Sequence, residues 1–179
     1  MLIAREKKRT NIAEYIIYMW QIEDSVRAYN LDIELIKRNI IDAYNQTDEI
    51  KKEIRFWYES LIEMMKSEKI EEKGHLQLIK NILDDLTDLH LYLLKSPFHS
   101  DYRTAYKNAT ESLIEFHSKL KVKNKTEIEV CFEALYSIFL LKLQKKDIST
   151  ETIEAVKSIS YLLALLAKKY LERENEKLQ

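Results

Sequence analysis

The chain has 179 residues, enough for one domain with a sizeable buried core. It contains one glycine and one proline, Gly74 and Pro97, where average usage gives about 12 and about 9, so sheet-rich folds that depend on turn residues are excluded. Its 29 basic and 30 acidic residues give a net charge of -1, which leaves no basic excess to attract nucleic acid.

This composition predicts an all-α fold, and helix ends follow from N-cap residues and from breaks in the 3.6-residue apolar period. The expected helices begin at capping-type residues: Asn11 with Glu14, Asp32, Thr47 or Asp48, Ser100, Thr126 with Glu129, and Ser149. We expect a bundle of about seven helices, near residues 11–29, 32–44, 48–66, 72–95, 100–120, 126–145 and 149–172. Residues 1–9 and 173–179 are expected to fray.

The last two of these helices differ from the others in lacking a broad polar face. Apolar residues cover nearly the whole circumference of helix 126–145, and helix 149–172 is apolar on every side from Tyr161 to Ala167. A helix that is apolar all round is buried all round. We therefore expect a single domain over residues 1–179 with these helices as a buried C-terminal hairpin, unless another subunit covers part of one.

Glu23 is the charged residue that fits its predicted helix least well. It lies almost on the centre line of an apolar stripe formed by Ile12, Tyr15, Ile16, Met19, Ile22 and Val26. Arg27, one turn later, is placed to form an i,i+4 ion pair with it. Glu23 is either a buried general base or ligand-binding carboxylate, or half of a structural ion pair that orders helix packing. We favour the structural interpretation.

Two histidines, His75 and His90, lie on the apolar face of the expected helix 72–95. Fifteen residues at about 1.5 Å each place them about 22 Å apart on a straight helix, so they cannot share a site. His90 is the better candidate because it lies in the middle of the helix. A lone histidine on an apolar face is nevertheless more often a hydrogen-bonded core residue than a ligand or catalyst.

Metal and phosphate motifs are weak in this sequence. Glu72 and His75 form one Glu-x-x-His pair, whereas a di-iron bundle needs two. The acidic residues Asp84, Asp85 and Asp88 are similar to the magnesium-diphosphate motif of helical prenyl synthases, but they fall mainly on the polar side of the helix. No phosphate loop, nucleophile elbow or zinc helix is present. We predict no metal and no cofactor.

The sequence predicts a reducing, cytoplasmic environment and no membrane association. Cys131 is the single cysteine, so it cannot form an intramolecular disulfide or a cysteine metal site. The N-terminal residues lack the apolar region of a signal peptide. The longest apolar run, Tyr161 to Ala167, is far shorter than the roughly 20 residues that a membrane span requires.

Four segments resemble a family of bacterial proteins of unknown function, DUF4924. They are NIAEYIIYMWQIEDSVRA at 11–28, KGHLQ at 73–77, LTDLHLYLLKSP at 86–97 and CFEALYSIFLLKLQKKDIS at 131–149. The resemblance covers most of the chain and implies a bacterial helical protein. It implies no catalytic or binding residues, because the family is uncharacterised.

Two functions from different classes follow. The first is a soluble, non-enzymatic helical interaction protein that self-associates, with a homodimer as the simplest assembly, because no catalytic motif is present and the C-terminal helix is apolar all round. The alternative is a pocket that binds or converts a small molecule between helices. Its candidate residues are Trp20, Glu23, Arg27, Trp57 and His90, with Glu23 as the buried carboxylate and the tryptophans as apolar walls.

Overall fold

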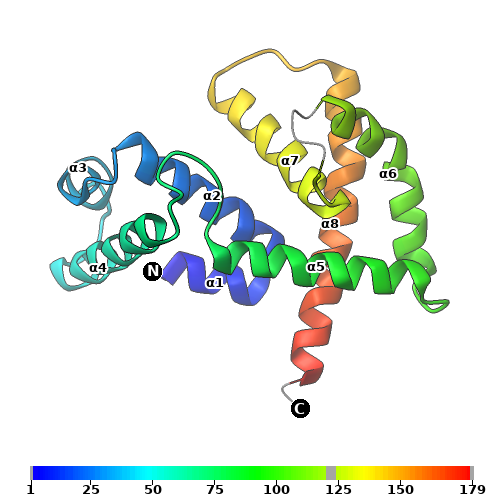
Figure 1. Ribbon diagram of the computed structural model, residues 1–179, viewed down its shortest axis with the longest axis horizontal. Coiled ribbons are helices and arrows are strands. Elements are labelled where there is room, and N and C mark those ends of the chain that lie inside the picture. The colour runs from blue at the N-terminus through cyan, green and yellow to red at the C-terminus, as the bar shows by residue number, and fades with distance from the viewer. Residues whose placement is uncertain (1, 120–123, 178–179) are drawn as a thin grey trace. The chain divides into compact units, whose positions relative to one another are not determined.

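The computed structural model describes residues 2–119 and 124–177, and every regular element in those ranges is a helix, which confirms the predicted all-α bundle (Figure 1). The elements are α1 (Leu2–Thr10), α2 (Ile12–Ala28), α3 (Ile33–Ile36), the π-helical turn η1 (Lys37–Ile41), α4 (Asp48–Ser67), α5 (Gln77–Lys95), α6 (Ser100–Lys119), α7 (Glu127–Leu143) and α8 (Thr150–Lys177).

Most predicted helix starts are confirmed by their capping contacts. Thr126 and Glu129 form the predicted capping box at α7, with the Thr126 N–H donating to Glu129 Oε2 at 2.7 Å and the Glu129 N–H donating to Thr126 Oγ1 at 3.2 Å. Asp32 accepts from the backbone N–H groups that open α3. Ser149 accepts from the Thr152 N–H at 3.2 Å and caps α8.

The N-terminal residues form a helix, so the expectation that residues 1–9 fray is wrong for the described part of that segment. In α1, Ala4 is buried and the Lys7 ammonium pairs with the Glu14 carboxylate at 2.7 Å. These contacts tie α1 to the start of α2. The apolar pattern in this segment is too short to predict a helix by itself, but tertiary contacts stabilise the helix that forms there.

The C-terminal helix is longer than predicted. It continues to Lys177, whereas the sequence predicts fraying over 173–179, of which residues 178–179 lie outside the described part of the chain. Arg173 forms an ion pair with Asp85 of α5 at 2.7 Å. This contact holds the last turns of α8 against another helix.

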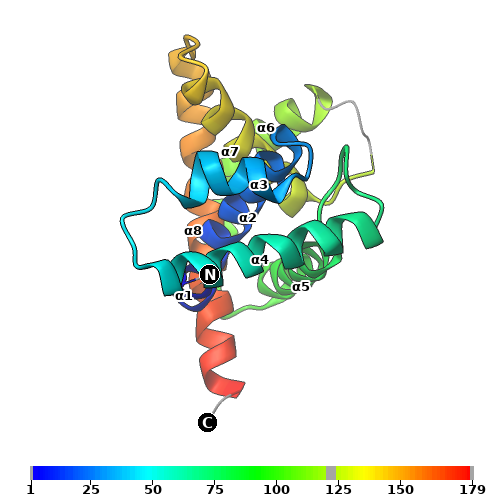
Figure 2. The ribbon, with the colours of Figure 1, turned by 90° about the vertical axis from the view of Figure 1, so that its left-hand side faces the viewer.

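The α4–α5 connection is longer than predicted because α5 begins at Gln77 and not near residue 72. Gly74 has φ +96°, a left-handed conformation that favours glycine and cannot continue a right-handed helix. The predicted helix 32–44 is likewise divided, into α3 and η1. Both α3 and η1 contact α4, and α3 lies beside α4 in Figure 2.

The chain divides into two compact units, with divisions near the start of α2 and inside α5. The first unit comprises Met1–Arg9 and Glu14–Asn81, and the second comprises Thr10–Ala13 and Ile82–Gln179. The organisation of these units as one domain stays a prediction. Each unit has its own fully buried large side chains, including Ile16, Tyr58 and Met65 in the first unit and Leu86, Tyr102 and Phe132 in the second.

In the second unit, α6, α7 and α8 all contact one another. Leu162, Leu163 and Leu166 of α8 are buried, whereas Tyr161 is 61% exposed and Ala164 is also exposed. The expectation that α8 is covered on every side is therefore wrong within this chain. The reason is that α6 and α7 cover only part of the circumference of α8.

Candidate functional site

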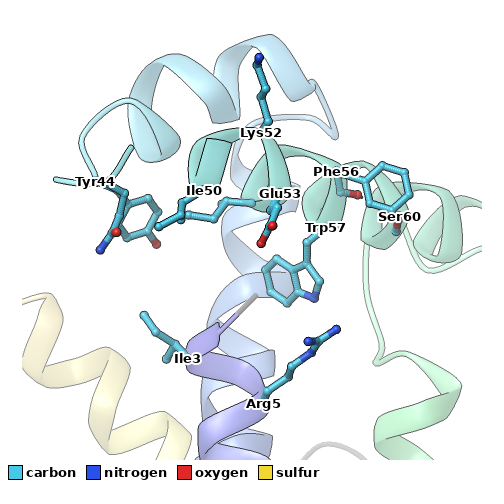
Figure 3. Close-up of a pocket in the computed structure, with 11 residues that line it drawn as sticks. Ile3, Arg5, Tyr44, Ile50, Lys52, Glu53, Phe56, Trp57 and Ser60 are labelled. Atoms are coloured by element: carbon cyan, nitrogen blue, oxygen red, sulfur yellow. Dashed lines mark hydrogen bonds between the residues drawn. The ribbon is translucent and has the colours of Figure 1, made fainter. Parts of the chain in front are cut away.

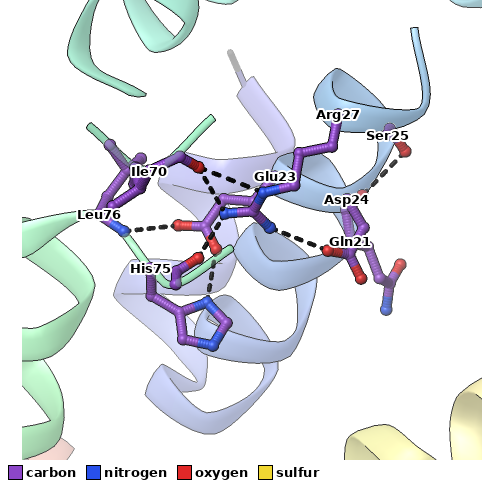
Figure 4. Close-up of polar contacts among 9 residues, drawn as sticks. Gln21, Glu23, Asp24, Ser25, Arg27, Ile70, His75 and Leu76 are labelled. Carbon is purple, nitrogen blue, oxygen red and sulfur yellow. Dashed lines mark hydrogen bonds and ion pairs between the residues drawn. The ribbon is translucent and has the colours of Figure 1, made fainter. Parts of the chain in front are cut away.

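Glu23 is 1% exposed, so its predicted position in the apolar stripe of α2 is confirmed (Figure 4). Both carboxylate oxygens have partners from the α4–α5 connection. Oε1 accepts the backbone N–H of Leu76 at 2.9 Å, and Oε2 lies 2.6 Å from Nδ1 of His75. An ionised carboxylate only accepts hydrogen bonds, so Nδ1 carries the hydrogen when Glu23 is charged.

Arg27 does not pair with Glu23, and the predicted i,i+4 ion pair is wrong. Its guanidinium donates to the backbone carbonyls of Ile70, at 3.3 and 3.4 Å, and of Gly74. It also pairs with Asp24 at 3.0 Å. Most of the Arg27 donors therefore bond the α4–α5 connection. The Glu23 carboxylate, which the sequence predicts as the partner of Arg27, instead contacts His75 and a backbone N–H.

The imidazole of His75 stacks on the indole of Trp20. The ring centroids are 4.3 Å apart and the planes are 12° from parallel. Trp20 is 3% exposed, while the side chain of His75 is 30% exposed. His75 therefore contacts both the buried Trp20 ring and the buried Glu23 carboxylate while its side chain remains partly exposed.

We call Trp20, Glu23, Arg27 and His75, with the segment 70–76 that they hold, the α2 clasp. A buried carboxylate that orients Nδ1 of a histidine is an arrangement found at general bases and metal ligands. In the α2 clasp, however, Glu23 and Arg27 also bind three backbone groups of the irregular segment 70–76. Glu23 accepts the Leu76 N–H, and Arg27 donates to the carbonyls of Ile70 and Gly74. The geometry therefore favours the structural interpretation, in which α2 fixes the path between α4 and α5.

His90 belongs to the second unit and is enclosed there by polar groups of α6 and α7. Nδ1 lies 2.7 Å from the Tyr102 hydroxyl, and Nε2 lies 3.1 Å from Glu127 Oε2. The Tyr106 hydroxyl donates to the other oxygen of Glu127 at 2.8 Å. We call His90, Tyr102, Tyr106 and Glu127 the His90 cluster. Since both ring nitrogens of His90 have protein partners, it is a hydrogen-bonded core residue.

Burial dominates the electrostatics of the His90 cluster. It lowers the pKa of His90, against the opposing hydrogen bond and charge of Glu127, because a charged imidazole loses its hydration. Burial and the neighbouring Glu127 raise the pKa of Tyr106 to about 12. The pKa of the Tyr102 hydroxyl is raised further, again mainly by burial. These groups are neutral near pH 7 and suit a structural role.

Trp57 lies apart from Trp20, Glu23 and Arg27, on a groove of the first unit with a volume of about 700 Å³ (Figure 3). α1 and α4 contribute most of its lining. The five residues of the predicted pocket therefore occupy three environments: the α2 clasp, the His90 cluster and this groove. The residues that line the groove do not include Trp20, Glu23 or Arg27.

Sequence reasoning missed three residues that matter here. The sequence favours His90 over His75, although His75 completes the contacts of Glu23. The sequence indicates Tyr102 only as one of several aromatic residues able to line a pocket, and Glu127 gives no signal, because both meet His90 from other helices only in the folded chain. Among the residues that the structure describes, no three His, Cys, Asp or Glu side chains converge to hold a metal ion.

Comparison with known proteins gives a family but no activity. Over the described ranges no helix has the length and apolar character of a membrane span. Neither the curated proteins nor the solved structures include a match to this chain. A family model described as a domain of unknown function, DUF4924, matches residues 1–177. The chain therefore belongs to the DUF4924 family.

Proposed function

We propose that this protein is a non-enzymatic helical interaction protein that self-associates through the end of its α7–α8 hairpin. The observation that supports the proposal is the exposure of large apolar side chains on both helices there. Leu143, the last residue of α7, is 64% exposed, and Ile153, in the first turn of α8, is 40% exposed.

The two helices do not meet in a tight turn at this end. Residues 144–149 arch from the end of α7 to the start of α8 in Figure 1, and the last four of them have no helical or turn structure. Further apolar side chains on either side are only half-buried. We define the hairpin end as Phe139, Leu140, Leu143, Ile148 and Ile153.

A second copy of the chain is the partner that best fits the hairpin end. Single exposed apolar residues are ordinary on protein surfaces, but a group of them on one structural element is typical of a contact site. A net charge of -1 gives two copies little reason to repel each other. A two-fold dimer would bring two hairpin ends together and is the commonest assembly of identical chains.

Replacing both Leu143 and Ile153 by lysine is expected to weaken self-association at least tenfold, a loss of about 1.4 kcal/mol or more, because each dimer would bury four charges in an apolar contact. Light scattering across a concentration series measures the dissociation constant. Phe98→Lys is the matched control, since Phe98 is 88% exposed in the same unit but outside the hairpin end. A wild-type chain that stays monomeric, or an equal loss in the control, contradicts the proposal.

Ligand binding is the second candidate function, and the groove beside Trp57 is the observation that favours it. A volume of about 700 Å³ lies within the usual range of small-molecule sites. A ligand at 100 times its dissociation constant should add about 2.7 kcal/mol to the free energy of unfolding. A thermal-shift screen should therefore give ligands whose effect disappears in Trp57→Ala. If no compound stabilises the wild type, ligand binding is rejected.

A further inference from the structure

The groove in the first unit presents one face of α4 to residues of α1. Ile50, Glu53, Ile54, Trp57 and Ser60 recur at spacings of three and four, which places them on one side of the helix. Figure 3 shows Ile50, Glu53, Trp57 and Ser60 above the groove, with Ile3 and Arg5 of α1 below. The groove therefore has two walls, each contributed by one helix of the same unit.

One half of the groove is an apolar and aromatic surface. Ile54 is buried, and Ile50, Trp57 and Tyr44 are half-buried at its lining. A surface of this kind favours a planar or branched apolar group on the ligand.

The two walls carry opposite charges that do not neutralise each other. In Figure 3 the Glu53 carboxylate points into the groove from α4, and the Arg5 guanidinium points up from α1 toward Trp57. Among the described residues, neither side chain forms an ion pair. Lys52 also borders the groove, but its ammonium points away from the cavity in the same view.

We propose that this groove binds a small zwitterion with an apolar or aromatic side chain, of the amino-acid type. The carboxylate of the ligand pairs with Arg5, its ammonium pairs with Glu53, and its side chain packs on Trp57 and Ile50. An amine without a carboxylate leaves Arg5 unused. An acid without an amine meets the negative charge of Glu53. This assignment rests on the second proposed function.

Calorimetric titration of the full chain with three related compounds tests the ligand class. L-Phenylalanine carries both charges, phenethylamine lacks the carboxylate, and 3-phenylpropionate lacks the ammonium. We expect L-phenylalanine to bind at least tenfold more tightly than either of the others, because each absent charge removes one charge-assisted contact.

Variants assign each contact to its residue. Arg5→Gln should weaken the binding of L-phenylalanine and 3-phenylpropionate but not that of phenethylamine, and Glu53→Gln should weaken L-phenylalanine and phenethylamine but not the acid. Both positions are exposed, so both variants are expected to fold. Lys52→Gln is the matched control and should bind all three compounds as the wild type does.

Each other result overturns the ligand class. Equal binding of L-phenylalanine and one of its single-charge analogues shows that the groove does not recognise a zwitterion, while ligand binding itself still stands. The ligand class is also wrong, and ligand binding still stands, if none of the three compounds binds but another compound from the thermal-shift screen stabilises the wild type and not Trp57→Ala. Failure of every compound in both the titrations and the thermal-shift screen rejects the ligand class together with the second proposed function.

Discussion

Glu23→Ala is expected to lower the free energy of unfolding by about 3 kcal/mol. The substitution removes a carboxylate that accepts the buried Leu76 N–H and contacts His75 Nδ1. Leu76 is fully buried, so its N–H would lose its partner in a place where water cannot replace it. His75 is 30% exposed and regains some hydration, which keeps the cost at the lower end of the range for a broken buried pair.

Urea denaturation of Glu23→Ala, Glu23→Gln and Glu14→Gln measures this contribution. Glutamine keeps an acceptor oxygen for one of the two donors, so Glu23→Gln should cost less than Glu23→Ala. Glu14 lies on the same helix but is 59% exposed, and its replacement should cost less than about 1 kcal/mol. If Glu23→Ala costs no more than this control, the α2 clasp does not stabilise the segment 70–76.

The Glu23 environment shows what helical periodicity can and cannot predict. Burial follows from position on one helix, so 100° per residue is enough to place Glu23 in the core. The identity of its partner depends on His75 and Leu76, which are 52 and 53 residues away. The i,i+4 rule considers only neighbours on the same helix, so it selected Arg27, whose guanidinium bonds the carbonyls of Ile70 and Gly74.

The α8 helix shows a similar limit for apolar composition. An apolar circumference predicts that a helix lies against other surfaces, and Leu162, Leu163 and Leu166 are indeed buried. Composition does not state whether those surfaces belong to the same chain. Tyr161 remains 61% exposed because the helices of its unit leave that side of α8 uncovered, which is a fact of packing that no local pattern contains.

His90 is expected to make the protein less stable in acid, and the sign follows from its lowered pKa. In the unfolded chain the imidazole titrates near 6.5, whereas in the folded chain its pKa lies below that value, mainly because of burial. Between the two values the unfolded chain binds a proton that the folded chain does not. The free energy of unfolding is therefore highest above pH 6.5 and falls as the pH falls toward the folded pKa, below which this contribution is constant.

Urea denaturation between about pH 7.5 and about pH 5 tests this, with a maximum slope of about 1.4 kcal/mol per pH unit for one proton. Carboxylates also titrate toward the acid end, so the informative quantity is the difference between the wild type and His90→Gln, whose amide can bond both Tyr102 and Glu127 without titrating. His99→Gln removes a histidine outside the His90 cluster and should keep the wild-type slope. The wild type and His90→Gln differ in one titrating imidazole. If His90→Gln loses stability as steeply as the wild type between pH 6.5 and about pH 5, His90 is therefore not the group that binds the proton on unfolding.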